Sequence, residues 1–191
     1  MHRYMRAMSA LAFAPRPAAE VLPLPILVAP DARLKLRCRP VGSADEAGLR
    51  DLIERMFASM YRAPGIGLAA PQVGVSLRLA IVDLMENDRK APLVLINPEV
   101  VGRSTDLAGR EEGCLSLPDQ YAEVVRPAVV KVRFTDETGA KREITAEGLL
   151  SACLQHEIEH LDGVLFVDHL SALKRNIILR RLAKEKRLKD L

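Results

Sequence analysis

The sequence predicts an α+β fold, with short antiparallel strands between helices and a further helix at the C-terminus. Three patterns lead to this prediction. Apolar residues recur at helical spacing before residue 63, several β-type segments separated by turn residues follow, and a second helical pattern starts at Ala146. A helix, a run of strands and another helix, in that order along the chain, are typical of α+β folds.

The first helix is predicted to begin near residue 43. Ser43 and Glu46 have the spacing of a capping box, in which the two side chains accept from free N–H groups at a helix start. Apolar residues then recur three and four apart, and Ala-Pro-Gly at 63–65 ends the helix. The residues that would form its buried face are Leu49, Leu52, Ile53, Met56, Phe57 and Met60.

Three strands are predicted from apolar and β-branched runs between turn residues. They lie at 77–84, 93–100 and 129–136. The residues Asp-Glu-Thr-Gly-Ala-Lys at 136–141 predict a hairpin turn, which leads into a further β-type run at 142–146.

From Ala146 the apolar spacing becomes helical again, until Asp162 and Gly163 end the segment. A last helical segment, at 174–191, has a lightly apolar side and carries eight basic residues against two acidic ones. The apolar positions of the earlier segment are Leu149, Leu150, Cys153, Leu154, Ile158 and Leu161, and those of the last are Ile177, Ile178, Leu182 and Leu188.

Composition favours one domain in a reducing compartment. The chain has 191 residues, of which 49% are hydrophobic, so a single domain at residues 21–191 can bury a core. Its three cysteines are too few for a disulfide framework. No run reaches the roughly 18 apolar residues that a membrane span needs. A net charge of +3 does not by itself indicate nucleic-acid binding. We therefore expect a soluble, cytoplasmic protein.

Residues 1–20 are expected to form a flexible N-terminal extension. They contain three arginines and no acidic residue before Glu20. The pattern faintly resembles a secretory signal or an organelle transit peptide, but its apolar stretch is very short and it has a single serine. Organelle targeting is one alternative, and a start at Met5 or Met8 is another.

The residues Gln-His-Glu-Ile-Glu-His at 155–160 contain the His-Glu-x-x-His pattern of metal-binding helices. Residues four apart on a helix differ by about 40° in direction, so His156 and His160 project side by side and can hold one cation. Glu157 points in a neighbouring direction, where it can reach water on that cation and act as general base and later as acid. A surface helix that carries these residues without a function is the alternative.

Two histidines need a third protein ligand to make a catalytic metal site with one open position. An extended pattern with a third histidine fails because residue 166 is Phe. Cys114, in the turn-like Glu-Gly-Cys-Leu-Ser-Leu-Pro, is the preferred third ligand. Cys114 as an ordinary buried thiol or a nucleophile, and Cys153 as a competing ligand, are the alternatives. The acids downstream of the histidines are poorly placed for this role: Asp162, Asp168, Glu185 and Asp190.

A further stretch, Gly-Ile-Gly-Leu-Ala-Ala-Pro-Gln-Val-Gly at 65–74, has three glycines and one polar side chain, Gln72. It lacks the spacings of phosphate-binding glycine loops. Gln72 suits a donor to a developing oxyanion, and glycine backbone groups can pair with an extended peptide. A turn-rich connection is the alternative.

Together these three stretches, in this order and spacing, closely resemble the signature motifs of peptide deformylases, and the similarity covers about residues 24–174. That family removes the N-formyl group from the N-terminal formylmethionine of nascent polypeptides and releases formate. The resemblance implies short antiparallel sheets around a central metal-binding helix. The alternatives are a His-Glu-x-x-His metallopeptidase and a catalytically silent metal-binding or ribosome-associated module.

The resemblance also implies one divalent metal ion per chain, usually Fe2+, which Zn2+, Ni2+ or Co2+ can replace. Thiolate and imidazole ligands suit all four metals. By resemblance, Cys114, His156 and His160 bind the metal, and Glu157 transfers the proton.

Further roles carried over by the resemblance concern the substrate. Gln72 and the backbone N–H of Leu115 stabilise the oxyanion, and the backbone of Gly67 aligns the substrate as an added strand. An apolar pocket for methionine is expected near the metal, with plain core packing as the alternative at each position. The pocket candidates are Ile66, Leu149, Ala152 and Cys153.

Two positions depart from the common pattern of the family. Glu159 stands where members most often have Asp, which leaves the ligands in place but alters their support. Tyr121 stands where many bacterial members have Arg, which puts in doubt recognition of the substrate backbone by an arginine. The basic segment 174–191 resembles the element by which bacterial members dock on the ribosome, so we expect rRNA contact there, with a solvated charged face as the alternative.

Overall fold

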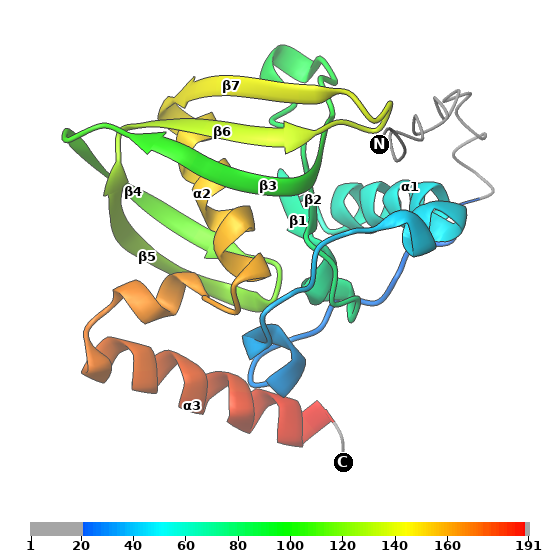
Figure 1. Ribbon diagram of the computed structural model, residues 1–191. Coiled ribbons are helices and arrows are strands. Elements are labelled where there is room, and N and C mark those ends of the chain that lie inside the picture. Colours follow the sequence, from blue (N-terminus) through cyan, green and yellow to red (C-terminus); the bar gives the residue numbers. More distant parts are fainter. Residues whose placement is uncertain (1–20, 190–191) are drawn as a thin grey trace.

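The computed structural model describes residues 21–189, so the expectations for residues 1–20 and for the last two residues lie outside the described chain. Within this range the fold is α+β, as predicted: a five-stranded and a two-stranded antiparallel sheet pack with three α-helices (Figure 1). The helices are α1 (Glu46–Arg62), α2 (Gly148–Leu161) and α3 (Ala172–Lys189).

The larger sheet has the strand order β1-β2-β3-β6-β7, and every neighbouring pair is antiparallel. β6 and β7 form the predicted hairpin. The smaller sheet, which we call the β4–β5 ribbon, is a second hairpin, and its two strands and β1 are not among the predicted strands. The strands are β1 (Gly67–Ala69), β2 (Leu79–Val82), β3 (Leu93–Arg103), β4 (Leu107–Cys114), β5 (Leu117–Pro127), β6 (Val129–Thr135) and β7 (Lys141–Glu147).

β2 is buried on both faces, because its side chains alternate between two cores as the period of a strand requires. Leu79 and Ile81 pack in the cluster that includes the apolar face of α1. Ala80 and Val82 pack in the cluster that includes α2. One face of the larger sheet is therefore covered by α1 and the other by α2.

α2 lies between the larger sheet and the β4–β5 ribbon (Figure 1). Leu154, Ile158 and Leu161 pack against the sheet. Toward the ribbon, Gln155 Nε2 donates to the carbonyl oxygen of Pro127 at 3.1 Å. Ten of the 14 residues of α2 are buried, so polar side chains on this helix are held away from water.

The start of α1 differs from the prediction. Ser43 does not cap the helix: residues 43–45 form a 3-10 turn, and α1 begins at Glu46. Asp45 closes this turn, because its carboxylate accepts from the N–H of Gly42 at 2.9 Å and from Arg39. The C-terminal boundary at Arg62 agrees with the predicted stop.

α3 packs on the body of the molecule through fewer apolar residues than predicted. Leu182 is buried, and Ile178 packs against the cluster around Phe166. Ile177 and Leu188 are 59% and 63% exposed, so they do not share the packed face. Among the described residues, no helix has the length and apolar character to cross a membrane.

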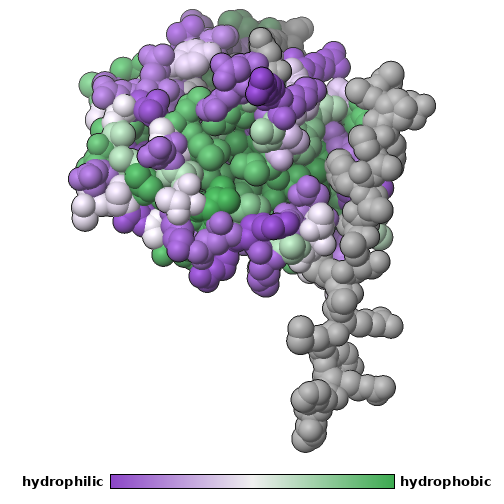
Figure 2. Space-filling view, turned by 90° about the horizontal axis from the view of Figure 1, so that it is seen from above, coloured by the Kyte–Doolittle hydropathy of each residue, from purple (hydrophilic) through white to green (hydrophobic). Residues whose placement is uncertain are grey.

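Some hydrophobic residues that pack against the core between the larger sheet and α2 are only partly buried. Leu84, Leu93 and Ile144 are partly buried and pack against this core. On the face seen from above the view of Figure 1, hydrophobic residues gather at the centre and hydrophilic residues surround them (Figure 2).

Candidate active site

α2 holds the His-Glu-x-x-His residues in the interior. His156 and His160 are 8% and 1% exposed, so they do not lie on a surface helix. Their rings stand edge to face with centroids 4.9 Å apart, as expected of residues one turn apart on a helix.

Cys114 reaches the two histidines from the last position of β4. The pairing of the ribbon shifts register between Gly113 and Cys114, where the chain turns toward β5. Cys114 Sγ lies 3.2 Å from His160 Nε2, and the three candidate ligand atoms lie within 4.8 Å of one another. Ligand atoms around a tetrahedral zinc ion are about 3.5 Å apart. The spacing therefore fits one ion.

The acids that the sequence offered as rivals for the third ligand are paired elsewhere. Each described one has a cationic partner outside the ligand group, and Asp190 lies beyond the described residues. The pairs are Asp162 with Arg78, Asp168 with Lys35, and Glu185 with Arg181.

Cys153 lies on α2 before His156 but is not in the group of three ligand atoms. Its Sγ is 3.9 Å from the carbonyl oxygen of Ile66. Burial raises the pKa of the Cys153 thiol well above its usual value, so the group is neutral, whereas a metal ligand is a thiolate.

Gln72 is fixed by hydrogen bonds at both ends of its amide group. Its Oε1 accepts from the N–H of Ala69 at 2.8 Å, which directs the NH2 group toward the β4–β5 ribbon. There Nε2 donates to Ser116 Oγ at 3.1 Å and lies 3.5 Å from Cys114 Sγ. The amide N–H groups therefore point to the candidate metal site.

Glu157 is buried next to β1. Its Oε2 has no hydrogen-bond partner among the described residues, and burial raises the pKa of the carboxyl to about 7. Gly67 leaves the space that the carboxylate occupies, because a Cβ at this position would collide with Glu157 and lie 2.9 Å from Cys153 Sγ.

A chain of polar contacts runs from His156 to the surface. His156 Nδ1 lies 3.0 Å from Glu112 Oε2, and Glu112 receives two hydrogen bonds from Arg126, at 2.5 and 3.0 Å. Arg126 also pairs with Glu159 at 2.9 Å, and Glu159 lies 2.8 Å from His169 Nε2. Burial opposes the charge on Glu112, but the hydrogen bonds from His156 and Arg126 prevail and lower its pKa to about 2. Glu159, the departure from the family pattern, thus supports Arg126.

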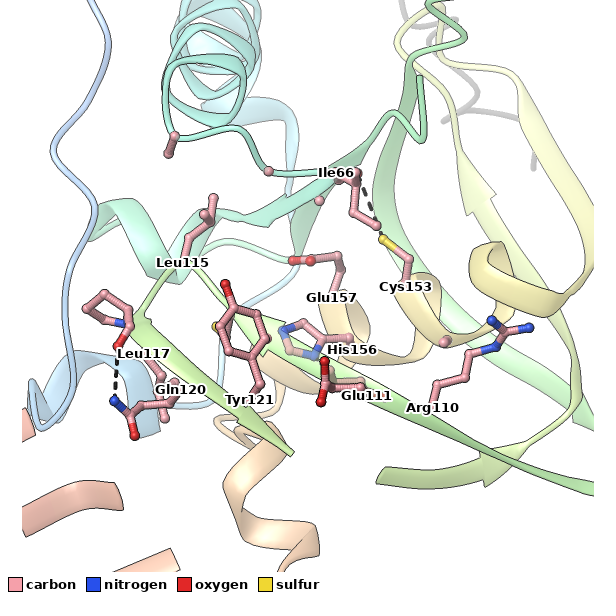
Figure 3. A pocket seen from close by; sticks show the side chains of 18 of the residues that line it. Ile66, Arg110, Glu111, Leu115, Leu117, Gln120, Tyr121, Cys153, His156 and Glu157 are labelled. Atoms are coloured by element: carbon pink, nitrogen blue, oxygen red, sulfur yellow. Dashed lines mark hydrogen bonds and ion pairs between the residues drawn. The ribbon is translucent and has the colours of Figure 1, made fainter. Parts of the chain in front are cut away.

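These groups line or border a cavity of about 820 Å³. Figure 3 shows the carboxylate of Glu157 projecting from α2 into it, between Leu115 and Cys153. Gln72 and Leu115 line the cavity, whereas His160 is not among its lining residues. The substrate-binding candidates from the sequence all line it: Ile66, Gly67, Leu149, Ala152 and Cys153.

Several residues at the site were not predicted from the sequence. Glu112 and Arg126 orient His156, and Arg110 and Glu111 line the cavity. One signal was available for Glu112: it precedes Cys114 by two, so in a strand both side chains lie on one face.

A family model for polypeptide deformylases matches residues 23–176. This chain belongs to the peptide deformylase family. A peptide deformylase of Rhizorhabdus wittichii is 52% identical over 168 residues, which are 85% of this chain and 94% of that protein. The crystal structure of a Legionella pneumophila peptide deformylase has 50% identity and a TM-score of 0.81, covering 88% of this chain and 98% of that one. The crystal structure of the Ehrlichia chaffeensis peptide deformylase in complex with actinonin has 37% identity and a TM-score of 0.82, and the match covers 87% of this chain and 99% of that one.

As a member of this family, the protein is a metal-dependent hydrolase. It removes the N-formyl group from the N-terminal formylmethionine of nascent polypeptides and releases formate. This function is favoured over the two alternatives left by the sequence, a metallopeptidase and a catalytically silent module.

Proposed function

We propose that Cys114, His156 and His160 bind one divalent metal ion for deformylation, and that this ion is Fe2+ in the cell. The proposal is carried by one observation, the three ligand atoms within 4.8 Å of one another beside the cavity. Three protein ligands leave one position open, as in catalytic sites. Zn2+, Ni2+ or Co2+ suit the same ligands, so metal analysis after anaerobic purification is the test of Fe2+.

The residues around the ligands fit a resident ion. Glu112 faces Nδ1 of His156, which leaves Nε2 of that ring for the metal. Oε2 of Glu157 is buried without a hydrogen-bond partner in the described chain, and such an atom is usually satisfied by an ion or water. A bound divalent ion supplies Lewis acidity and lowers the pKa of water toward about 7.

Glu157 serves as the proton carrier. Its carboxylate takes a proton from the water whose oxygen adds to the formyl carbon. It then gives that proton to the amine nitrogen as the C–N bond breaks, which yields formate and a free N-terminus. The buried position of this carboxylate in the cavity wall supports this role.

Gln72 and the backbone N–H of Leu115 stabilise the negative charge that develops on the formyl oxygen. The hydrogen bond from Ala69 to Oε1 supports this role for Gln72, because it fixes the amide with its N–H groups directed at the site. A donor held in place before the reaction costs no reorganisation when the charge appears.

The backbone of Gly67 aligns the substrate as an added strand. β1 is an edge strand of the larger sheet, so one side of it is free to pair with an extended peptide. The methionine side chain then enters the part of the cavity lined by Ile66, Leu149, Ala152 and Cys153.

A cysteine-to-alanine substitution tests the ligand assignment. Cys114→Ala is expected to bind metal much more weakly and to lose formate release from formyl-Met-Ala-Ser. Cys153→Ala is the matched control, because it removes another thiol that lines the same cavity and is expected to retain the metal. Metal content at wild-type affinity in Cys114→Ala would remove this residue from the ligands.

The chain from residue 21 onward is one catalytic domain that acts in the cytoplasm, where α3 contacts ribosomal RNA. Arg180, Lys184 and Arg187 support this contact, since their spacing of four and three places them on one exposed side of α3. The three have no ion-pair partner among the described residues. Cations on one helix side suit the phosphate backbone.

Substitution of these three residues tests the ribosome contact without removing the buried Leu182. The triple variant Arg180→Gln, Lys184→Gln, Arg187→Gln is expected to sediment less with ribosomes, and the binding that remains should depend less steeply on salt. The control variant Arg62→Gln, Arg103→Gln, Lys141→Gln has the same net charge as the α3 variant and should bind ribosomes better than the α3 variant does. Equal binding of the wild type and the α3 variant would rule out the contact.

A further inference from the structure

A 3-10 helix at Phe166–His169, labelled η6, lies between α2 and α3 and packs against the β4–β5 ribbon (Figure 1). The chain reaches η6 through a sharp turn after α2. Gly163 in this turn has a φ of 76°, and a Cβ there would lie 2.5 Å from the carbonyl oxygen of Lys35, so glycine is required. Asp168 then closes the first turn of η6 by accepting from the N–H of Leu165 at 2.8 Å. These contacts hold η6 beside the C-terminal end of α2.

The first residue of η6, Phe166, is 1% exposed and stacks on the imidazole of His156. The two ring centroids are 6.3 Å apart, and the ring planes differ by 23°. Phe166 also belongs to the apolar cluster against which Cys114 packs. Residue 166 is the position at which the extended His-Glu-x-x-His pattern has its third histidine. In this chain the position carries a ring that cannot bind an ion but that orients a residue proposed to bind one.

The last residue of η6, His169, begins the polar chain that reaches the edge of the same imidazole. Its Nε2 lies 2.8 Å from Oε2 of Glu159, while Oε1 of that carboxylate pairs with Arg126 at 2.9 Å. Arg126 donates twice to Glu112, whose Oε2 lies 3.0 Å from Nδ1 of His156. Each oxygen of Glu159 thus has a partner, and the contact with His169 fixes the direction in which the other oxygen meets Arg126.

The two contacts restrain different movements of the His156 ring. Stacking opposes tilting of the imidazole plane, whereas the bond at Nδ1 opposes rotation within that plane. Plain core packing accounts for a buried Phe166 by itself. It does not account for His169, whose side chain is 34% exposed and is nevertheless directed at the carboxylate that pairs with Arg126. One short helix therefore reaches one candidate ligand by two routes.

We propose that η6 positions the metal ligand His156 from two sides. Phe166 holds the plane of the imidazole, and His169 holds its Nδ1 through the polar chain that begins at Glu159. This rests on the proposed metal site. A ligand that is oriented before the ion binds loses less conformational freedom on binding, so both contacts strengthen metal binding. Phe166 and His169 do not line the cavity, so they are positioning residues and not catalytic ones.

Competition with a chelator, on the full chain, tests the stacking contact. Phe166→Leu keeps a buried apolar side chain but removes the ring, so affinity for Zn2+ should fall about two- to tenfold, the range of one aromatic pair. The absorption bands of the Co2+-loaded variant should shift, because they report the geometry at the ion. Phe134→Leu is the matched control, since it makes the same change in a core that does not line the cavity. It should lower thermal stability and leave affinity and absorption unchanged.

Two substitutions of His169 test the polar contact. His169→Phe keeps a ring of similar size but removes the N–H donor, and affinity for Zn2+ should fall about two- to fivefold. This is less than the about 10- to 100-fold loss typical of a group bonded directly to a ligating histidine. His169→Gln should recover most of the affinity, because its amide nitrogen can take the place of Nε2. Lys131→Met, which breaks a surface ion pair with Glu143, should have no effect.

Combination with Glu112→Gln separates positioning from a general loss of structure. If His169 acts through the polar chain, His169→Phe should cause almost no further loss of Zn2+ affinity once Glu112 has been replaced. Phe166→Leu acts on the face of the ring, so it should weaken binding by a similar factor with and without Glu112→Gln.

Any one of three results would overturn the proposal, because it requires both contacts. They are equal losses of affinity in Phe166→Leu and Phe134→Leu, no recovery in His169→Gln, and an undiminished effect of His169→Phe beside Glu112→Gln. None of these results bears on which residues bind the ion. The proposed metal site itself fails instead if the wild type binds no ion, or if Cys114→Ala binds it with wild-type affinity.

Discussion

α2 and the β4–β5 ribbon meet at the candidate metal ligands, but they contribute in different ways. α2 brings two imidazoles and a carboxylate together through spacing along one buried helix. The ribbon contributes Cys114 at its turn, and the orienting pair Glu112 and Arg126 comes from two different strands. Groups that act on the reacting atoms are thus concentrated on a rigid helix. Groups that orient them and meet the substrate depend on strand register.

The largest effect is expected on α2. Glu157→Gln keeps the shape of the side chain and removes its capacity to accept a proton, so kcat for formate release should fall by about 10²- to 10⁴-fold. Metal content should not change, because the three ligands are intact. Near-wild-type kcat in this variant would mean that proton transfer does not reside on the helix.

The second largest effect is expected at Gln72. This residue belongs to neither α2 nor the ribbon, and its amide nitrogen lies close to Cys114. Gln72→Leu removes the N–H donor, and kcat is expected to fall by about 10²- to 10³-fold. Ser116→Ala serves as a graded comparison, since it removes only the 3.1 Å contact that steadies the amide. The decrease in kcat should be much smaller in Ser116→Ala than in Gln72→Leu. Similar losses in the two variants would assign the effect to the local structure and not to the donor.

A smaller effect is expected inside the ribbon. Glu112→Gln removes the charge that His156 and Arg126 face, and metal affinity should decrease by about 10- to 100-fold. Glu143→Gln is the control, since it breaks ion pairs of Lys131 and Arg133 at the surface of β6 and β7. Competition with a chelator measures both affinities. Unchanged affinity in Glu112→Gln would show that the ribbon contributes Cys114 alone.

The contrast between the two regions also explains what the sequence could predict. The helices at 46–62 and 148–161 and the β6–β7 hairpin follow from local periodicity and turn residues, and they are present. The ribbon was missed because Gly109, Glu111 and Gly113 are poor strand formers, so its structure comes from pairing with β5. The predicted capping box is absent because Ser43 lies inside a 3-10 turn, which the carboxylate of Asp45 closes on the N–H of Gly42.

At the site, the motif residues could be named from the sequence, because the three motifs together, in their order and spacing, resemble those of one family. The chain of contacts from Glu112 through Arg126 to Glu159 and His169 could not, since it joins residues from β4, β5, α2 and the segment before α3. Such contacts depend on how the ribbon lies against α2. No local pattern specifies that arrangement.

The double burial of β2 limits which parts of this protein can vary. A substitution at Leu79, Ala80, Ile81 or Val82 disturbs one of two cores that share a backbone, so neither can be repacked without shifting the other. The exposed side of the ribbon carries no such constraint, because Tyr121 and Glu111 face solvent. Libraries that seek altered peptide preference should therefore keep β2 constant and randomise the ribbon, where diversity costs little stability.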